Sequence, residues 1–291
     1  MQEITNMDCI YDRLCRNPNF KEKYKMSSKS KFQPICELMD FFKQYYVPDL
    51  IGSECKVLFI LESPHTDEII HKHPLAGSSG LNLSKGLIDA GLNEIANANG
   101  NYLPFGCWLQ ENINTSIGKK FGIMNVCNFP MQSEAYSCGK EIYVKDSLER
   151  LRTLINTPST NKEKELFNVN YILNHLSQPY DNVNARQKFK EDFKIVSEAL
   201  LIKIPKLKKI DKRHIAKIKQ IQNIINKQNI AIVFCGKVSF YLIYPYLNNI
   251  KSENLLYIPH PSNKSWNNDS TITNKFDSLK KIVDSLAIIK D

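Results

Sequence analysis

Four short apolar segments constrain the fold of this chain more than any other feature of its sequence. They span residues 56–61, 122–127, 230–235 and 255–259. Each is an almost continuous apolar run that ends in a polar or glycine-containing loop, which is typical of strands buried on both faces of a parallel sheet. Helical patterns lie between and after them, around 81–97, 106–119, 140–156, 237–248 and 273–289. The sequence therefore predicts an α/β fold with an open, mostly parallel sheet flanked by helices.

Two regions look like additions to this sheet. Residues 1–50 contain a polar stretch followed by an amphipathic pattern, which predicts a helical N-terminal extension. Residues 51–291 then form the sheet-containing domain. Within it, residues 140–228 are almost wholly helical in pattern and separate the second apolar run from the third. We interpret 140–228 as a helical, basic insertion.

The positive charge of the chain is concentrated in that insertion. The formal net charge is +9, and segment 203–219 alone holds eight basic residues and one acidic residue. The rest of the chain is nearly balanced, with 31 basic and 29 acidic residues. Isoleucines repeat at helical spacing here, which predicts that one face packs inward and the lysines face out; they are Ile215, Ile218, Ile221 and Ile225. Such a stripe suits a polyanion such as nucleic acid, and a merely solvated helix face is the alternative.

Composition excludes several classes of protein. A hydrophobic fraction of 42% and an aromatic fraction of 10% predict a globular chain and not a disordered one. No apolar run is long enough to span a membrane, and the N-terminal residues contain no apolar signal core. We therefore expect a cytoplasmic protein with no membrane partner.

Neither the cysteines nor the histidines carry a metal signature. The eight cysteines include no C-x-x-C pair, so a cluster built from Cys9, Cys15, Cys107 and Cys127 has no supporting spacing. His71 and His73, with Asp67 nearby, are spaced like ligands but are also ordinary loop residues. We expect no metal and no cofactor.

The loops after the apolar runs are the place to search for function, since open α/β sheets bind ligands at the carboxyl ends of their strands. They read "ESPHTDE", "NVCNFP", "CGKVSF" and "HPSNKSW", and "HPLAGSSGLNLSKGL" follows the first of them. In order and spacing these segments resemble the uracil-DNA glycosylase superfamily, most closely its iron–sulfur branch. The resemblance covers roughly 56–130 and 230–266.

The resemblance implies an enzyme that extrudes a base from DNA and cleaves its N-glycosidic bond. Carboxylates near the sugar and hydrogen-bond donors near the base stabilise the charges that separate in this reaction. Glu62 matches the glutamate of the family's first motif, and Glu68 matches a second acidic position. His260 matches the histidine that donates to the base oxygen, and Asn125 matches the asparagine that reads the base edge.

The same resemblance implies DNA contacts outside the reacting centre. Pro64 and Ser262 match positions that grip the flanking phosphates. Lys237 is the nearest candidate for a Schiff-base lysine, and we expect it to contact phosphate instead. Trp266 follows the final motif, where the family carries a wedge that fills the gap left by a flipped base. We also assign to DNA binding the lysines of the final loop and of the basic segment, which are Lys264, Lys206, Lys208 and Lys209.

The sequence departs from the family pattern in ways that bear on the substrate. Ser63 replaces an aspartate of the best-known uracil enzymes, as in the iron–sulfur branch, and His65 replaces a glycine or tyrosine. Leu75 stands where an aromatic ring normally stacks on the base. A pocket formed by these residues and Asn125 favours a bulkier, modified pyrimidine. Some superfamily members remove hypermodified bases from phage DNA, and this chain resembles them.

Structural roles compete with several of these assignments. Glu62 could cap the next helix, and Asn125 could bond backbone groups at a strand end. Trp266 could be packed in the core, and His65 could be an ordinary surface residue.

For the protein as a whole, we expect a monomeric, monofunctional DNA glycosylase. Its rivals are a uracil repair enzyme and a non-catalytic DNA-binding module of the same fold. A nucleotide or phosphoester hydrolase is a further rival, but it should carry clustered carboxylates that bind a metal.

Overall fold

A computed structural model describes most of the chain, and the chain divides into two compact units, Met1–Gln44 and Tyr45–Asp291. The described residues are 44–97, 99–132, 135, 147–178, 182–203, 210–227, 230–248, 254–262, 266 and 277–284. Almost the whole predicted N-terminal extension thus lies outside the described residues. Tyr45, Val47 and Leu50 are buried, so residues from 45 onward belong to the sheet-containing unit.

Five strands form one open, mixed sheet. They are β1 (Leu50–Ile51), β2 (Val57–Leu61), β3 (Phe121–Asn125), β4 (Ala231–Cys235) and β5 (Leu255–Ile258). Their order is β1-β3-β2-β4-β5, in which β1 runs antiparallel to β3 and the other four strands are parallel. The predicted fold class is confirmed, and all four apolar runs are strands. The two-residue strand β1 was not predicted, because so short a segment shows no period in the sequence.

Central strand β2 explains why the apolar runs are continuous. It pairs with β3 and β4 on either side, and all five of its residues are buried. Leu58 and Ile60 face one hydrophobic core, whereas Val57, Phe59 and Leu61 face the other. A strand that contributes to two cores has no solvent face on which to place polar residues.

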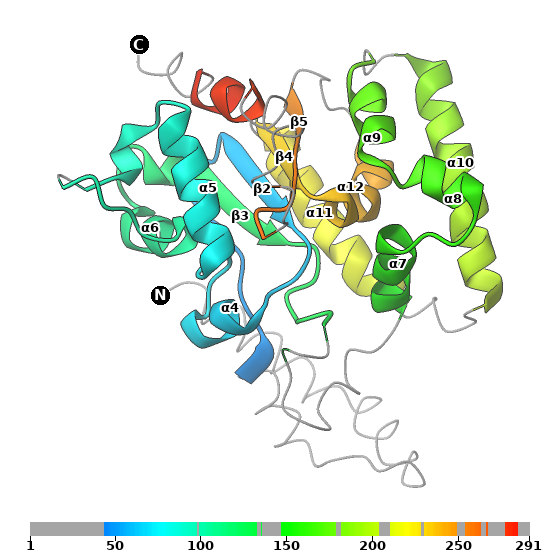
Figure 1. Ribbon diagram of the computed structural model, residues 1–291, viewed down its shortest axis with the longest axis horizontal. Coiled ribbons are helices and arrows are strands. Elements are labelled where there is room, and N and C mark those ends of the chain that lie inside the picture. Colours follow the sequence, from blue (N-terminus) through cyan, green and yellow to red (C-terminus); the bar gives the residue numbers. More distant parts are fainter. Residues whose placement is uncertain are drawn as a thin grey trace, which may run out of the picture. The chain divides into compact units, whose positions relative to one another are not determined.

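One core lies mainly under two helices from the segment between β2 and β3. Helices α5 (Ser78–Asp89) and α6 (Phe105–Asn112) cover this face of the sheet together with the helix at 277–284. Figure 1 shows α5 and α6 on one side of the strands. The ring of Phe105 lies 5.5 Å from that of Phe59 and 5.4 Å from that of Phe121, centroid to centroid. Aromatic packing therefore fixes α6 against the sheet.

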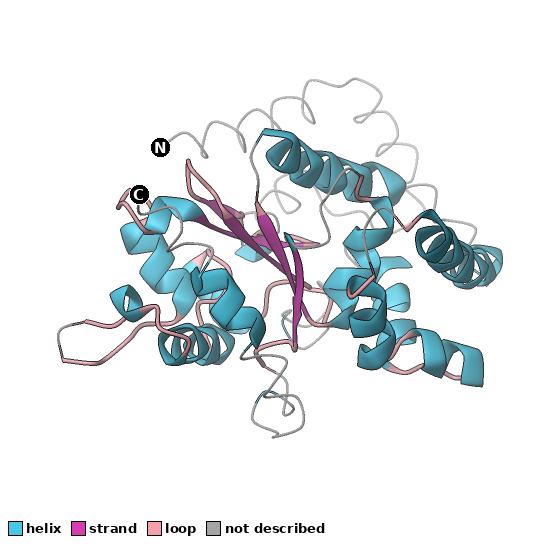
Figure 2. Ribbon diagram, turned by 90° about the horizontal axis from the view of Figure 1, so that it is seen from above, coloured by secondary structure: helices cyan, strands magenta, loops and turns pink. Residues whose placement is uncertain are grey.

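The other core is built largely by the predicted insertion. Its helices are α7 (Ser147–Asn156), α8 (Asn161–Leu166), α9 (Val169–Leu176), α10 (Val183–Lys203) and α11 (Ile210–Lys227). Ile155, Phe189 and Ile221 share one hydrophobic cluster with Phe234 of β4 and with α12 (Lys237–Ile243). Helices stand on both sides of the strands in Figure 2. The insertion is thus part of the main fold, because without it one face of the sheet would be exposed.

The basic segment follows its predicted pattern only in part. Ile221 is fully buried, and Ile218 and Ile225 pack partly against the same core. Lys217, however, is buried, which corrects the expectation that the lysines of this helix all face outward. The side chain of Ile215 and the whole of 204–209, with Lys206, Lys208 and Lys209, lie outside the described residues. Within the part of the chain that is described, no helix could cross a lipid bilayer.

Candidate active site at the carboxyl edge of the sheet

The strand order locates a ligand crevice before any side chain is considered. From β2, the chain continues to β3 on one side and later returns to β4 on the other side. This is the order of a flavodoxin-like sheet, in which ligands bind outside the carboxyl ends of the two strands at the reversal. In this sheet, residues 62–65 follow the carboxyl end of β2, and residues 236–237 follow that of β4. Residues 259–262 follow β5, which is the neighbour of β4.

Glu62 lies at this crevice in contact with a residue from the insertion. The Nε atom of Arg152, on α7, donates a hydrogen bond to Oε1 of Glu62. The side chains of Glu62 and Arg152 are 12% and 25% exposed, so the pair is partly shielded from water. Burial raises the pKa of Glu62, and the guanidinium of Arg152 lowers it in part. The N-cap of the next helix, α4 (Thr66–His71), is His65 and not Glu62.

His260 is held in one orientation by the residues that follow it. Its Nδ1 atom lies 2.7 Å from Oγ of Ser262 and accepts a 3.3 Å hydrogen bond from the backbone N–H of Ser262. Since a backbone N–H only donates, Nδ1 is the acceptor and the ring proton sits on Nε2. Burial, together with the positive charge of Arg152, lowers the pKa of His260 to about 4. At neutral pH the ring is therefore an uncharged donor through Nε2–H.

Two residues from other elements position the loop that carries His260. Gly236, which precedes α12, has φ 87°, and a Cβ atom at this position would lie 3.0 Å from Cβ of His260. Only glycine takes up this conformation at low cost and also leaves room for the histidine. The side-chain amide of Asn82, on α5, donates a 2.7 Å hydrogen bond to the carbonyl of Pro261.

Asn125, the last residue of β3, carries an unpaired buried amide. Its side chain is 1% exposed, and among the described residues neither Oδ1 nor Nδ2 has a hydrogen-bond partner. Its backbone N–H donates to Oδ1 of Asp49 at 3.3 Å. Leaving a buried polar group unpaired costs about 1–3 kcal/mol, so such a group in a folded protein calls for an explanation. A ligand that bonds both amide atoms supplies one.

Backbone hydrogen bonds join the loop after β2 to the loop after β3. The N–H of Cys127 donates to the carbonyl of Glu62 at 3.1 Å, which continues the pairing of the two strands. The N–H of Met131 donates to Oγ of Ser63 at 3.3 Å. These bonds place Glu62 and Asn125 on adjacent strand ends at the same edge of the sheet.

Glu68 holds the neighbouring loop in place. Its Oε2 accepts the backbone N–H of His65 at 2.7 Å, and its Oε1 accepts that of Leu75 at 2.5 Å. Burial raises the pKa of Glu68 to about 7, although these two bonds lower it. Both carboxylate oxygens are engaged by the backbone, and this geometry fixes the loop. The catalytic role predicted for Glu68 stays a prediction and is not needed below.

Three residues predicted to face a base or DNA are buried in this structure. Leu75, predicted in the base pocket, is packed in the core that also holds Phe105. Pro64, predicted at a phosphate, is buried too. Trp266, predicted as a DNA wedge, packs beside Gly86 of α5, as in the alternative reading of its sequence context. In this structure the three side chains contribute to packing, and their predicted contacts with a base or with DNA stay predictions.

The remaining residues predicted to contact DNA, and His65 of the predicted base pocket, differ in their placement. Ser262 and His65 are exposed near the crevice. Lys237 is partly buried, and its Nζ lies 3.4 Å from the carbonyl oxygen of Phe167 at the end of α8. This partial burial lowers the pKa of Lys237. Lys264 lies outside the described residues.

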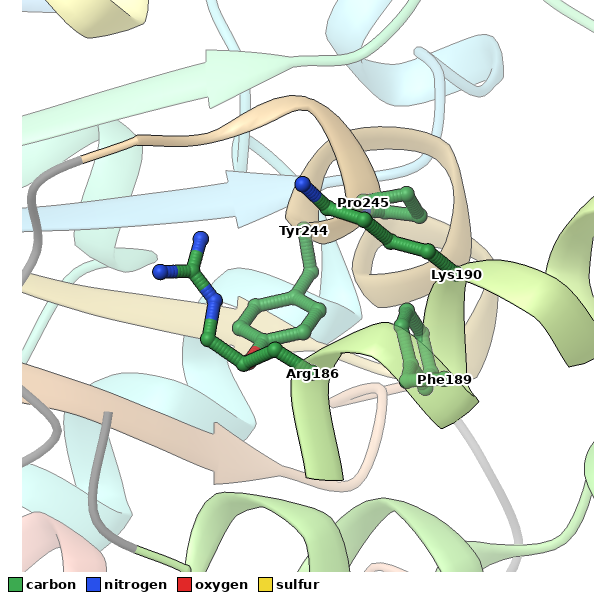
Figure 3. A pocket seen from close by; sticks show the side chains of 5 residues that line it. All are labelled: Arg186, Phe189, Lys190, Tyr244 and Pro245. Atoms are coloured by element: carbon green, nitrogen blue, oxygen red, sulfur yellow. The ribbon is translucent and has the colours of Figure 1, made fainter. Parts of the chain in front are cut away.

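A separate small hollow lies on the insertion between α10 and the turn Tyr244–Tyr246. Figure 3 shows the side chains that line it, which are Arg186, Phe189, Lys190, Tyr244 and Pro245. The hydroxyl of Tyr244 lies 2.7 Å from Nε2 of His175, whose ring stacks on Phe189. The lining contains two cations and no carboxylate, so it offers no general base for hydrolysis.

The described segments contain no cluster of three or more His, Cys, Asp or Glu side chains arranged to hold a metal ion. His71 and His73 lie with ring centroids 5.9 Å apart. Cys107 is a free thiol, Cys127 is partly buried, and Cys9 and Cys15 lie outside the described residues.

The site therefore combines one carboxylate, one neutral imidazole donor and one unpaired amide at the carboxyl edge of the sheet. Sequence motifs identified Glu62, His260 and Asn125, but they missed Arg152, Asp49 and Asn82. Asn82 lies within the quoted segment 73–87, where nothing singled it out, and no motif marks Asp49 or Arg152. Arg152 is separated from Glu62 by 90 positions. Neither a known protein family nor a curated protein matches the chain in sequence comparison.

Proposed function

We propose that this protein is a DNA glycosylase that binds an extruded base and hydrolyses its N-glycosidic bond. The observation that carries the proposal is that Glu62, His260 and the amide of Asn125, unpaired among the described residues, lie at strand ends along one edge of the sheet. Strands β2 and β3 are neighbours, and β4 lies between β2 and β5. The order and spacing of the motif loops supply the substrate class, since in sequence they resemble those of uracil-DNA glycosylases.

In the proposed reaction the bond between C1′ of the sugar and the base nitrogen breaks, and its electron pair leaves with the base. Water attacks C1′, and Glu62 accepts a proton from that water after stabilising the positive charge that develops on the sugar. Nε2–H of His260 donates to the carbonyl oxygen of the base, on which negative charge accumulates. The base then takes a proton from solvent, and Glu62 releases its proton to solvent.

Neutral His260 suits this role better than a charged imidazolium would. A donor that keeps its proton stabilises the anionic base without being consumed, and burial together with Arg152 keeps the pKa of His260 well below neutrality. Asn125 offers one donor and one acceptor, which match the edge of a pyrimidine. This pairing also explains why the amide has no partner among the residues that the structure describes.

We propose a modified pyrimidine as the substrate on the basis of the first loop. Ser63 and His65 stand where uracil enzymes carry other residues, and exposed His65 lies beside the crevice. Leu75 no longer contributes to this argument, because its side chain is buried in the core.

A panel of DNAs tests the proposal directly. The panel contains thymine, uracil, hydroxymethylated pyrimidines and glucosylated phage DNA, each incubated with the protein in the presence of a chelator. Release of a base leaves alkali-labile abasic sites, which appear as strand breaks after heating in alkali. We expect breaks with at least one modified pyrimidine and none with the Glu62→Gln variant.

Other outcomes point to the rival functions. Cleavage of uracil DNA alone indicates a repair enzyme. Tight DNA binding with no abasic sites on any substrate indicates a non-catalytic module. Activity that the chelator abolishes, or cleavage of a phosphoester instead of a glycosidic bond, overturns the proposal.

A further inference from the structure

Arg152 makes the helical insertion part of the candidate active site. It projects from α7, which packs against α12, the helix that follows β4. From there its Nε reaches Glu62 at the end of β2, and its charge also acts on His260 after β5. One cation from a segment without any motif thus bonds Glu62 and lowers the pKa of His260, the two residues assigned to chemistry.

The pairing is specific in geometry and shielded from solvent. Nε is the guanidinium nitrogen closest to the backbone, so a bond through it fixes the direction of the whole side chain. The exposed fractions of 25% for Arg152 and 12% for Glu62 separate this pair from an ordinary surface ion pair. For comparison, the pair Lys85–Asp89 on α5 has side chains that are 62% and 50% exposed.

We infer that Arg152 is a positioning residue of this site, whose guanidinium orients the Glu62 carboxylate and supplies the positive charge that acts on Glu62 and His260. The inference rests on the proposed function only where it concerns the rate of base release. The effect on Glu62 and His260 themselves is a property of the protein without substrate.

Other ionisable groups near the crevice do not substitute for Arg152. Glu68 on α4 is engaged by the backbone N–H groups of His65 and Leu75. Lys237 at the start of α12 lies near the carbonyl of Phe167, and His65 is exposed. Among the described residues, Arg152 is a charged group that lowers the pKa of both Glu62 and His260.

The direction of the effect follows from the charges. A nearby cation favours the charged form of a carboxyl and disfavours the charged form of an imidazole, so both pKa values are lower with Arg152 present than without it. Base release requires charged Glu62 and neutral His260, and acid removes both states. Arg152 therefore extends activity toward lower pH.

The first test needs no substrate. NMR spectra of protein with labelled histidine side chains follow the six histidines during a pH titration, and His260→Gln identifies the signal of His260. We expect no titration of His260 above about pH 5 in the wild type, as its pKa is about 4. In Arg152→Met the midpoint should rise by about half a unit or more, since a neighbouring charge shifts a pKa on this scale.

The second test is the pH dependence of base release on a substrate found with the DNA panel. In Arg152→Met, the pH at which the rate of base release falls on the acidic side of the pH–rate profile, its acidic limb, should be higher by about one unit. The reason is that Glu62 loses an adjacent opposite charge. Arg152→Lys keeps the charge but not the planar guanidinium, so it should restore the position of the limb and only part of the rate. Lys162→Met, at an exposed position on α8, removes the same charge elsewhere and should leave the profile unchanged.

The outcomes separate this inference from the proposed function. An unchanged His260 midpoint in Arg152→Met, with unfolding by urea showing that the variant is folded, overturns the inference whether or not the protein has activity. If the acidic limb of the pH–rate profile moves by the same amount in Lys162→Met, the inference about Arg152 is also overturned. The shift would then follow from the net charge of the protein and not from the position of Arg152. A shifted midpoint in a protein that releases no base supports the inference and refutes the glycosylase proposal.

Discussion

The ammonium group of Lys217 lies 2.6 Å from Oδ2 of Asp49, and the two side chains are only 8% and 11% exposed. The other carboxylate oxygen of Asp49 accepts a 2.9 Å bond from the amide of Asn128 and a 3.3 Å bond from the backbone N–H of Asn125. A lysine of the basic insertion thus neutralises the carboxylate that holds the end of β3. Part of the positive charge of the insertion therefore serves the fold and is not available to DNA.

This pair predicts a large loss of stability for Lys217→Met. The change leaves Asp49 as an uncompensated buried charge, which costs about 3–5 kcal/mol. Lys219→Met, two positions along the same helix at an exposed site, should change stability by about 0.5 kcal/mol or less. Urea unfolding of both variants measures the difference, and equal stabilities would show that the pair contributes nothing.

Asn125→Ala should separate function from stability. Because the amide has no partner among the described residues, its removal should leave the free energy of unfolding equal or higher. The rate of base release should fall by about tenfold or more, because a contact that recognises the base is lost. Asn128→Ala is the matched control, since Asn128 bonds both Val47 and Asp49 and its loss should destabilise the protein. If Asn125→Ala is the more destabilised of the two, the amide has a structural partner and not a ligand.

Glu62→Gln and His260→Ala should each slow base release by about a hundredfold or more, the scale of losing one electrostatic stabiliser. DNA binding should be largely retained, because neither residue belongs to the basic segment. Single-turnover rates and a gel-shift titration measure the two effects separately. Wild-type rates in both variants would place the chemistry elsewhere.

Gly236→Ala should displace His260, although Gly236 itself has no assigned role in the chemistry. The new methyl group would face Cβ of His260 at 3.0 Å, and alanine is disfavoured at φ 87°. We expect a loss of about 1 kcal/mol or more in stability and slower base release through displacement of His260. Gly100→Ala is a control for the cost of placing alanine at a positive φ. The φ of Gly100 is 75°, and no atom lies within 4 Å of the added carbon. Equal activity in the two variants would argue against a role for the close approach to His260.

Reversal of the charge at Lys206, Lys208 and Lys209 tests the predicted DNA contact of the basic segment. The triple change to glutamate should weaken DNA binding and flatten its salt dependence, because each phosphate contact adds to the slope of log affinity against log salt. Fluorescence anisotropy at several salt concentrations gives that slope. An unchanged slope would assign these lysines to another role.

The sequence by itself determined the sheet and the edge that carries the candidate site. Buried parallel strands need continuous apolar runs, and the chain has four of them, each followed by a loop that contains polar residues. The carboxyl ends of parallel strands share one edge, so the loops after them could be assigned to one place from local pattern alone. The choice of Glu62, Asn125 and His260 within those loops came from the resemblance of the loops to known motifs.

Only the tertiary structure decided which neighbours those residues have. Arg152 and Lys217 lie in a segment that reads as a basic insertion, yet they pair with Glu62 and Asp49 over separations of 90 and 168 positions. Burial is likewise a property of packing between elements. Leu75, Pro64 and Trp266 follow motifs that suggest exposure, but the helices and loops packed around them cover their side chains. Local pattern shows what a segment can form, and long-range contacts decide which of its side chains remain accessible to a ligand.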